Sequence, residues 1–175
     1  MSELNIQANN FFNSIDSIPS VNFPPIIVAD NFRTPENIGS IIRLAGSIGC
    51  KEVFVTDTNK NEIRISKIKK TATTAFSSVK LTFITTNELL SSKIPSNYTS
   101  VAIETAPNAE NIFTTNLPDK IIFFFGNEAF GVSKQILDFC QKTVYIPLPG
   151  DVKSLNVTHA AAISLFEWYR KTIIR

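Results

Sequence analysis

The sequence predicts an α/β domain with a mainly parallel sheet and helices on both faces. Short apolar segments with the character of strands alternate along the chain with helical segments of about ten or more residues. Residues 121–125 (IIFFF) are apolar at every position, as expected for a strand that is buried on both faces. Residues 35–48 place isoleucine and alanine at helical spacing between strand-like residues 25–30 and 52–56.

The first half of the chain begins with a polar helical pattern over residues 3–17 and a buried strand over residues 25–30. Thr34 is the expected N-cap of the next helix, because Pro35 fits the first helical position and Gly49 fits the end. The elements expected after it are a strand at 52–56, a basic helix at 63–73, a strand at 79–84 and a short helix at 87–93.

The second half continues the alternation. Strands are expected at residues 100–104, 121–125 and 144–146, and Ser133 caps a helix that runs to about residue 141. Residues 155–172 form the last helix, which is apolar almost all round. Such a helix is deeply buried or lies in a subunit interface.

Composition limits the class of protein. The 175 residues fit one domain, here residues 25–175, preceded by an N-terminal helical extension, residues 1–24. The longest apolar run is far shorter than the ~18 residues that span a bilayer, and the N-terminus lacks the pattern of a signal peptide. Cys50 and Cys140 are too few for a disulfide framework or a recognisable zinc site. We therefore expect a reduced, cytoplasmic protein with no metal and no membrane association.

Charge is unevenly distributed along the chain. Residues 60–80 carry a net charge of +5, whereas residues 81–119 carry −3. A basic segment in a nearly neutral chain is typical of a surface that binds a polyanion. A solvated surface loop and helix explain the same segment equally well.

Polar residues follow the first predicted strand. Because ligands bind at the carboxyl ends of strands in a parallel sheet, these segments are candidate sites. Asn37 falls in the first turn of the helix, and Gly39 shares a helical face with Arg43, which leaves room beside the guanidinium. The alternative is that Asn37 only helps to cap the helix and Arg43 is a surface charge.

Two further segments follow later strands. Gly126 and Gly131 flank Glu128, and the glycines let a backbone approach a ligand or turn sharply. Glu128 could hold a cation or cap the next helix. In the segment IPLPGDVKSLNVTHAAA, Ser154 is an acceptable N-cap, but Asn156 at the second helical position is a poor helix former. Helix capping and a polar ligand pocket both remain possible explanations.

Together these segments resemble the SpoU (TrmH) family of RNA ribose 2′-O-methyltransferases, within the SPOUT superfamily. NFRTPENIGSIIRLAGSIG is similar to the first family motif, FFFGNEAFGVS to the second, and VYIPLPGDVKSLNVTHAAAISLFEWY to the third. Their order and spacing agree over residues 25–173. The resemblance implies an S-adenosyl-L-methionine (AdoMet) cofactor, a homodimer and a deep C-terminal trefoil knot, which the apolar pattern would not have revealed.

The resemblance also assigns site residues. The catalytic group it implies is Arg43, Asn37, Glu128, Ser154 and Asn156, with Asn37 and Glu128 orienting Arg43. The cofactor-binding positions it implies are Glu104, Thr105, Gly126, Asn127, Gly131, Ile146, Leu148, Ser154 and Leu155. The residues expected to contact RNA are Arg33, Arg64, Lys67, Lys69 and Lys70.

The function expected from these assignments is methyl transfer to a ribose 2′-hydroxyl of tRNA or rRNA. The short segment before residue 25 favours tRNA, because relatives that act on rRNA often carry a separate N-terminal domain. One alternative is a ribosome-assembly factor that binds RNA with the same fold but without turnover. Another is a generic α/β protein that binds ATP or NAD.

Overall fold

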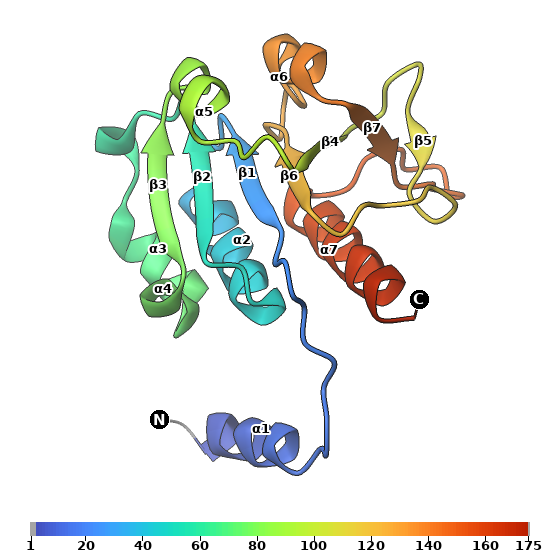
Figure 1. Cartoon of the computed structure of the whole chain (residues 1–175). Helices are drawn as coiled ribbons and strands as arrows, with labels where there is room; N and C mark the ends of the chain where they lie inside the picture. The colour runs from blue at the N-terminus through green and yellow to red at the C-terminus, as the bar shows by residue number, and fades with distance from the viewer. Residues whose placement is uncertain (1–2, 175) are drawn as a thin grey trace.

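A single parallel sheet forms the centre of the molecule (Figure 1). The computed structural model describes residues 3–174, with side chains described from residue 7. The strand order is β3-β2-β1-β6-β4-β7-β5, and each neighbouring pair is parallel. The strands are β1 (Ile26–Asp30), β2 (Glu52–Thr56), β3 (Lys80–Ile84), β4 (Thr99–Ile103), β5 (Glu110–Asn111), β6 (Ile121–Phe125) and β7 (Lys142–Tyr145). The predicted parallel sheet is confirmed.

Helices connect the strands and cover both faces of the sheet, as predicted. They are α1 (Glu3–Asn13), α2 (Pro35–Ile48), α3 (Ile65–Ala72), α4 (Ala75–Ser78), α5 (Thr86–Ser92), α6 (Lys134–Phe139) and α7 (Val157–Ile173), with a 3₁₀ turn η1 (Lys60–Glu62). One apolar cluster joins the sheet to α2, α3 and α7, and a second joins it to α5 and α6. None of the described helices is long and apolar enough to cross a membrane.

The central strand β6 contributes to both clusters. Ile121, Phe123 and Phe125 pack on the side of α2 and α7, whereas Ile122 and Phe124 pack on the opposite side. All five side chains are buried. The prediction that this strand is buried on both faces is therefore confirmed, and its neighbours β1 and β4 are fixed in the middle of the sheet.

The boundaries of α2 agree with the sequence signals. Thr34 is the N-cap residue in an extended conformation, although its side chain makes no capping hydrogen bond, and Pro35 is the first helical residue. Gly49 ends the helix in the left-handed conformation with φ of 84°. This cap is the one that the sequence predicted.

Other boundaries differ from the prediction. The first helix ends at Asn13 rather than at residue 17, because the Ser14 hydroxyl donates to the Phe11 carbonyl and closes the last turn. The helix α6 ends at Phe139 rather than at residue 141, and α7 begins two residues later than expected. The elements missing from the prediction are β5, η1 and α4, all too short to show a periodic pattern.

Gly39 does not leave room beside Arg43, so that prediction was wrong. A Cβ atom at Gly39 would lie 2.7 Å from Thr71 Cβ and 2.8 Å from the Ile68 carbonyl oxygen. The space beside this glycine is therefore filled by α3, whereas Arg43, one turn further along the same face, is exposed. The small residue allows two helices to approach closely.

The helix α1 stands apart from the sheet in Figure 1. Its Phe11 and Phe12 side chains are exposed, at 61% and 57%. The chain that leads from α1 to β1 is attached to α7, because the Tyr169 hydroxyl donates to the Pro19 carbonyl at 2.8 Å. The division of the chain into an extension, residues 1–24, and a domain, residues 25–175, stays a prediction.

Candidate active site

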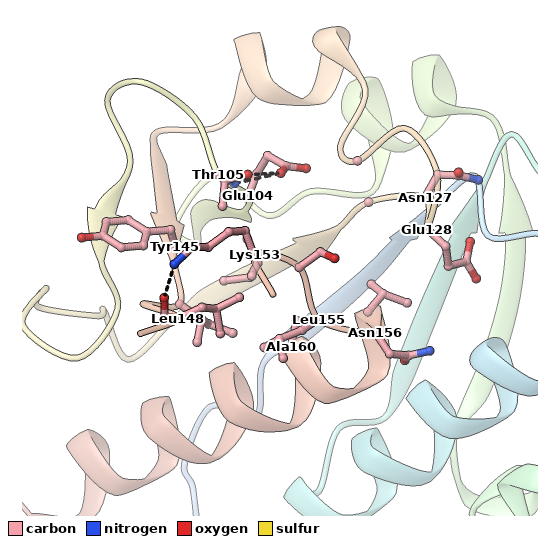
Figure 2. Close-up of a pocket in the computed structure, with 16 residues that line it drawn as sticks. Glu104, Thr105, Asn127, Glu128, Tyr145, Leu148, Lys153, Leu155, Asn156 and Ala160 are labelled. Carbon is pink, nitrogen blue, oxygen red and sulfur yellow. Dashed lines mark hydrogen bonds between the residues drawn. The ribbon is translucent and has the colours of Figure 1, made fainter. Parts of the chain in front are cut away.

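Three loops enclose a cavity of about 290 Å³ at the carboxyl ends of β4, β6 and β7 (Figure 2). A cavity of this size is at the lower limit of the range of about 300–1,000 Å³ for small-molecule sites. Each residue predicted to bind a cofactor lines this cavity. These residues are Glu104, Thr105, Gly126, Asn127, Gly131, Ile146, Leu148, Ser154 and Leu155. The structure therefore brings together segments that are far apart in the sequence.

The loop after β6 is a closed turn. The backbones of Asn127 and Gly131 exchange two hydrogen bonds, of 2.9 and 2.8 Å. The buried Asn127 side chain donates to the Asn31 carbonyl at 2.7 Å and accepts from the Ala129 amide at 2.8 Å. Asn127 thus joins this loop to the end of β1, so its side chain shapes the wall of the cavity.

Glu104 connects the loops after β4 and β6. One carboxylate oxygen accepts from the Thr105 amide at 2.8 Å, and the other accepts from the Val132 amide at 2.9 Å. Gly131 has φ of +71°, and a Cβ atom there would lie 2.3 Å from Glu104 Oε2. A glycine is therefore required both by the turn and by the carboxylate beside it.

The third loop joins β7 to α7. Asn156 is the N-cap of α7, and its Oδ1 accepts from the Thr158 amide at 2.8 Å and from the Thr158 hydroxyl at 2.6 Å. The prediction that Ser154 caps the helix and that Asn156 lies inside it was wrong by two residues. Both side chains nevertheless line the cavity. Capping and pocket formation are thus combined in Asn156.

Lys153 was missed by sequence reasoning. Its ammonium group donates to the carbonyl oxygens of Leu148 and Gly150, so these bonds stabilise the turn of the loop between β7 and α7. Among the described residues that line the cavity, Lys153 is the only cationic one. Figure 2 shows the bond to Leu148 across the loop. The sequence did contain a signal for this role. Lys153 directly precedes Ser154, and it is the only basic residue between Pro147 and Asn156.

The first and second predicted segments meet through Asn37 and Glu128. The Asn37 side-chain amide donates to the Glu128 carboxylate, so Glu128 joins α2 to the cavity instead of capping the helix after it. The start of that helix is held otherwise, because the Ser133 amide donates to buried Asp30 at 2.7 Å. In Figure 2, Glu128 lies at the same end of the cavity as Asn156.

Arg43 is not joined to this pair. It is exposed, and no hydrogen bond or ion pair of its side chain is present in the described part of the chain. Arg43 follows Asn37 by six residues, which corresponds to about 9 Å along a helix and a different side of it. The expected orientation of Arg43 by Asn37 and Glu128 is therefore absent within one copy of the chain.

The residues expected to bind RNA are exposed and differ in their contacts. Lys67 forms an ion pair with Glu36 at 2.9 Å, and the Lys69 ammonium lies 5.3 Å from the centre of the Phe76 ring. Arg33 lies in the loop after β1, and Arg64 is the N-cap residue of α3. Lys70 is in the last turn of α3. Four of these five positions thus lie on α3 or at its start, and we refer to them as the basic surface on α3.

Both cysteines are free thiols, and burial raises the pKa of Cys50 and of Cys140 to about 12. Neither thiol is therefore a ready nucleophile at neutral pH. Within residues 3–174, no group of three His, Cys, Asp or Glu side chains is arranged to hold a metal ion. The polar side chains at the cavity carry amides, hydroxyls, carboxylates and the ammonium group of Lys153.

The fold and the cavity define an α/β protein whose ligand site is built from loops at the carboxyl edge of a parallel sheet. The chain belongs to the SpoU rRNA Methylase family, whose model matches residues 24–166. The chain is 28% identical over 151 residues to 23S rRNA (guanosine-2'-O-)-methyltransferase RlmB of Haemophilus influenzae. That alignment covers 86% of this chain and 61% of the relative, so the chain spans less than two thirds of the relative's length.

Two solved structures show the same fold. The SpoU methyltransferase AviRb from Streptomyces viridochromogenes, in complex with AdoMet, has a TM-score of 0.73 and 24% identity, over 91% of this chain and 62% of that chain. A structure that describes 2-OH methylation of C/U34 on tRNA has a TM-score of 0.74 and 20% identity, over 99% of both chains. Both similarities establish the fold across nearly the whole of this chain.

Proposed function

We propose that this protein is an AdoMet-dependent RNA methyltransferase that acts on a ribose 2′-hydroxyl. The observation that carries the proposal is the single cavity that gathers each of the nine positions expected to bind the cofactor. Family membership supports the same reaction. Residues 25–175 would form the catalytic domain, and residues 1–24 its N-terminal extension.

The residues at the cavity fit AdoMet by their chemistry. Ile146, Leu148 and Leu155 offer apolar surface suited to a flat base, and the loop backbones offer hydrogen-bonding groups. Glu128 places a carboxylate at one end, where it would favour a positively charged group. AdoMet, when bound, would supply a methyl group on a positively charged sulfur that leaves readily.

Arg43 would stabilise negative charge at the reacting hydroxyl. A ribose hydroxyl is a weak acid, so the loss of its proton is the difficult part of the reaction. A charged guanidinium has donors and no acceptor, so Arg43 is unsuited to act as a simple base. We infer that it binds the adjacent phosphate and the developing oxyanion, and that the phosphate or a water accepts the proton.

The remaining polar residues would position these groups. The Asn37–Glu128 hydrogen bond holds the start of α2 against the cavity, and Asn156 and Ser154 would direct the hydroxyl. Correct placement of two reacting groups can supply ~7–11 kcal/mol of the barrier reduction.

A homodimer would complete the site. Phe130 and Val152, in the loops after β6 and β7, are 78% and 75% exposed, and Leu155, which lines the cavity, is 37% exposed. Exposed apolar patches of this kind are typical of interfaces. We propose that a second copy covers this surface and that Arg43 of one copy serves the cavity of the other. The deep trefoil knot near the C-terminus, which the family resemblance implies, is part of the same proposal.

The proposed substrate is tRNA in preference to rRNA. A solved structure of the same extent, matched over 99% of both chains, concerns methylation of tRNA, whereas the relative from Haemophilus influenzae is named for 23S rRNA. Nucleoside mass spectrometry of tRNA and rRNA from cells with and without this protein tests the choice. Loss of a 2′-O-methyl nucleoside from tRNA alone is expected, and loss from rRNA alone would contradict it.

Replacement of Arg43 tests the mechanism. Arg43→Ala should abolish methyl transfer while the affinity for AdoMet stays within a few-fold of the wild type, because Arg43 does not line the cofactor cavity. Transfer of labelled methyl groups to unmodified tRNA and calorimetry with AdoMet measure the two effects. Lys134→Ala is the control, because it removes an exposed cation on α6 outside the proposed site. Loss of cofactor binding in Arg43→Ala would reject the assigned role.

A further inference from the structure

A second cavity lies at the outer edge of the sheet, away from the loops of the candidate active site. Its volume is about 540 Å³, and it is lined by η1, α4 and the edge strand β3. Three lysines line it, Lys51, Lys60 and Lys80, and no Asp or Glu side chain does so among the described residues. We refer to this cavity as the edge groove.

The charge in the edge groove is largely uncompensated. Lys80 forms an ion pair with Glu52 at 2.7 Å, and that carboxylate also accepts from the Thr82 hydroxyl. Neither Lys51 nor Lys60 has an acidic partner in the described part of the chain. Two ammonium groups without acidic partners in one groove attract an anion.

Aromatic rings lie beside these charges. The Lys60 ammonium is 6.0 Å from the centre of the Phe83 ring, and Lys69, on the basic helix α3, is 5.3 Å from the centre of the Phe76 ring. Both rings line the groove and are half-buried, so they are held in place by the core. Phosphate-binding cations that alternate with aromatic rings are typical of grooves for single-stranded nucleic acid.

The edge strand adds backbone groups. The Lys80 amide donates to the Lys51 carbonyl, so the backbone of Lys80 faces β2. Because backbone groups alternate in direction along a strand, the amide and carbonyl of Leu81 and of Phe83 face away from β2, toward the open edge. Among the described strands, β3 pairs only with β2. Such donors and acceptors can bind a ribose 2′-hydroxyl, which both donates and accepts.

We propose that the edge groove binds a single-stranded segment of the RNA substrate next to the nucleotide that is modified. This proposal rests on the proposed function and adds a second contact surface to it. The strand β3 lies three strands from β6, about 14 Å across the sheet at the usual spacing, and Phe83 lies near the carboxyl end of β3, the end at which the cavity lies. Lys69 connects the groove to the basic surface on α3.

Binding of a labelled single-stranded RNA of mixed sequence tests the proposal without turnover. Lys51→Glu and Lys60→Glu should each weaken binding, and each should reduce the slope of log affinity against log salt by about 0.7. Phe83→Leu should weaken binding about five-fold or more and leave that slope unchanged, because it removes a stacking surface and no charge. Fluorescence anisotropy over a range of salt concentrations measures both effects.

The matched control is Lys134→Glu, which makes the same change of charge at a side chain that is 87% exposed on α6. It should bind RNA as the wild type does. Thermal unfolding followed by the single tryptophan, Trp168, verifies that each variant is folded. If Lys51→Glu and Lys60→Glu bind RNA no more weakly than Lys134→Glu, the groove does not bind RNA, and a protein segment paired with β3 becomes the better occupant.

The outcomes separate the two proposals. If the wild type transfers no methyl group but the groove variants bind RNA more weakly than the wild type, the proposed reaction is wrong and the proposal for the groove stands. If the wild type methylates RNA but the groove variants bind RNA as tightly as Lys134→Glu does, the proposed reaction stands and the proposal for the groove is wrong. A DNA strand of the same sequence should bind more weakly than the RNA, since it lacks the 2′-hydroxyl.

Discussion

At the scale of single residues, Asn156 combines two tasks that are usually separate. Its side-chain oxygen accepts two hydrogen bonds from Thr158, which fixes both the start of α7 and the orientation of the amide. Asn156 also lines the cavity, at the same end as Glu128. A helix cap can therefore place a hydrogen-bond donor beside a substrate without additional supporting groups.

Two substitutions at Asn156 separate these tasks. Asn156→Asp keeps an accepting oxygen and should unfold within a few tenths of a kcal/mol of the wild type, whereas Asn156→Ala should cost about 1 kcal/mol. If the amide directs the ribose hydroxyl, both variants should lose methyl transfer. Urea unfolding and the methyl-transfer assay provide the two measurements. If Asn156→Asp transfers methyl groups as fast as the wild type, the side chain of Asn156 only caps α7 and does not direct the ribose hydroxyl.

At the scale of secondary-structure elements, the contact between α2 and α3 determines where the basic helix lies. Gly39 allows the backbone of α3 to approach, with the Ile68 carbonyl and the Thr71 side chain against its Cα. Ile68 and Ala72 are buried in this contact, so Lys69 and Lys70 are directed outward. The position of the proposed RNA surface thus depends on the close approach of α2 and α3 at Gly39.

Gly39→Ala tests this dependence. The added methyl group would overlap Thr71 and the Ile68 carbonyl, so the free energy of unfolding should fall by about 1–3 kcal/mol. Ser47→Ala, at an exposed position of the same helix, should be neutral or slightly stabilising. Urea denaturation followed by Trp168 fluorescence compares the two variants. If Gly39→Ala is as stable as Ser47→Ala, α3 moves away from α2 to admit the added methyl group at little cost in free energy, and the predicted dependence is wrong.

At the scale of the whole molecule, the C-terminal helix is attached to the segment between β5 and β6. The Lys171 ammonium donates to the carbonyls of Ile112 and Thr115, at 2.7 and 2.6 Å, and the Trp168 indole donates to the Pro118 carbonyl at 2.9 Å. Glu167 lies 2.8 Å from Arg170 and 3.4 Å from Lys171. Hydrogen bonding to Arg170 lowers the pKa of Glu167, against the opposing effect of burial.

The lowered pKa of Glu167 predicts a dependence of stability on pH. A carboxyl whose pKa is lower in the folded state stabilises that state above its unfolded pKa, near 4.5, and loses this contribution as pH falls through the folded value. Glu167→Gln should therefore reduce the free energy of unfolding by about 1–2 kcal/mol at pH 7, and the difference should shrink below about pH 4.5. Unfolding of both proteins across pH measures the difference.

The control for this prediction is the exposed ion pair of Lys134 and Asp138. Because these side chains are 87% and 62% exposed, Asp138→Asn should change the stability by less than about 0.5 kcal/mol at any pH. A constant difference between the wild type and Glu167→Gln from pH 7 to pH 3 would contradict the assigned role of the carboxylate.

Much of the fold could be predicted from local patterns. The apolar run of β6 and the signals at Pro35 and Gly49 depend only on neighbouring residues, so they could be identified in the sequence. The start of α7 was placed two residues early, since Ser154 and Asn156 are both good caps and only the bond to Thr158 distinguishes them. The strand β5, with two polar residues, exists because β7 lies beside it.

The sequence alone determined the order of the longer strands and helices and the parallel sheet, because periodicity and caps depend on neighbouring residues. Its three motifs, through the family resemblance, also determined the positions that would line a cavity. Only the tertiary structure decided which groups meet. It joined Asn37 to Glu128 across 91 positions, left Arg43 on another side of α2, and placed Lys51, Lys60 and Phe83 around one groove. Contacts between distant segments depend on how the helices pack against the sheet, and a one-dimensional pattern does not contain that information.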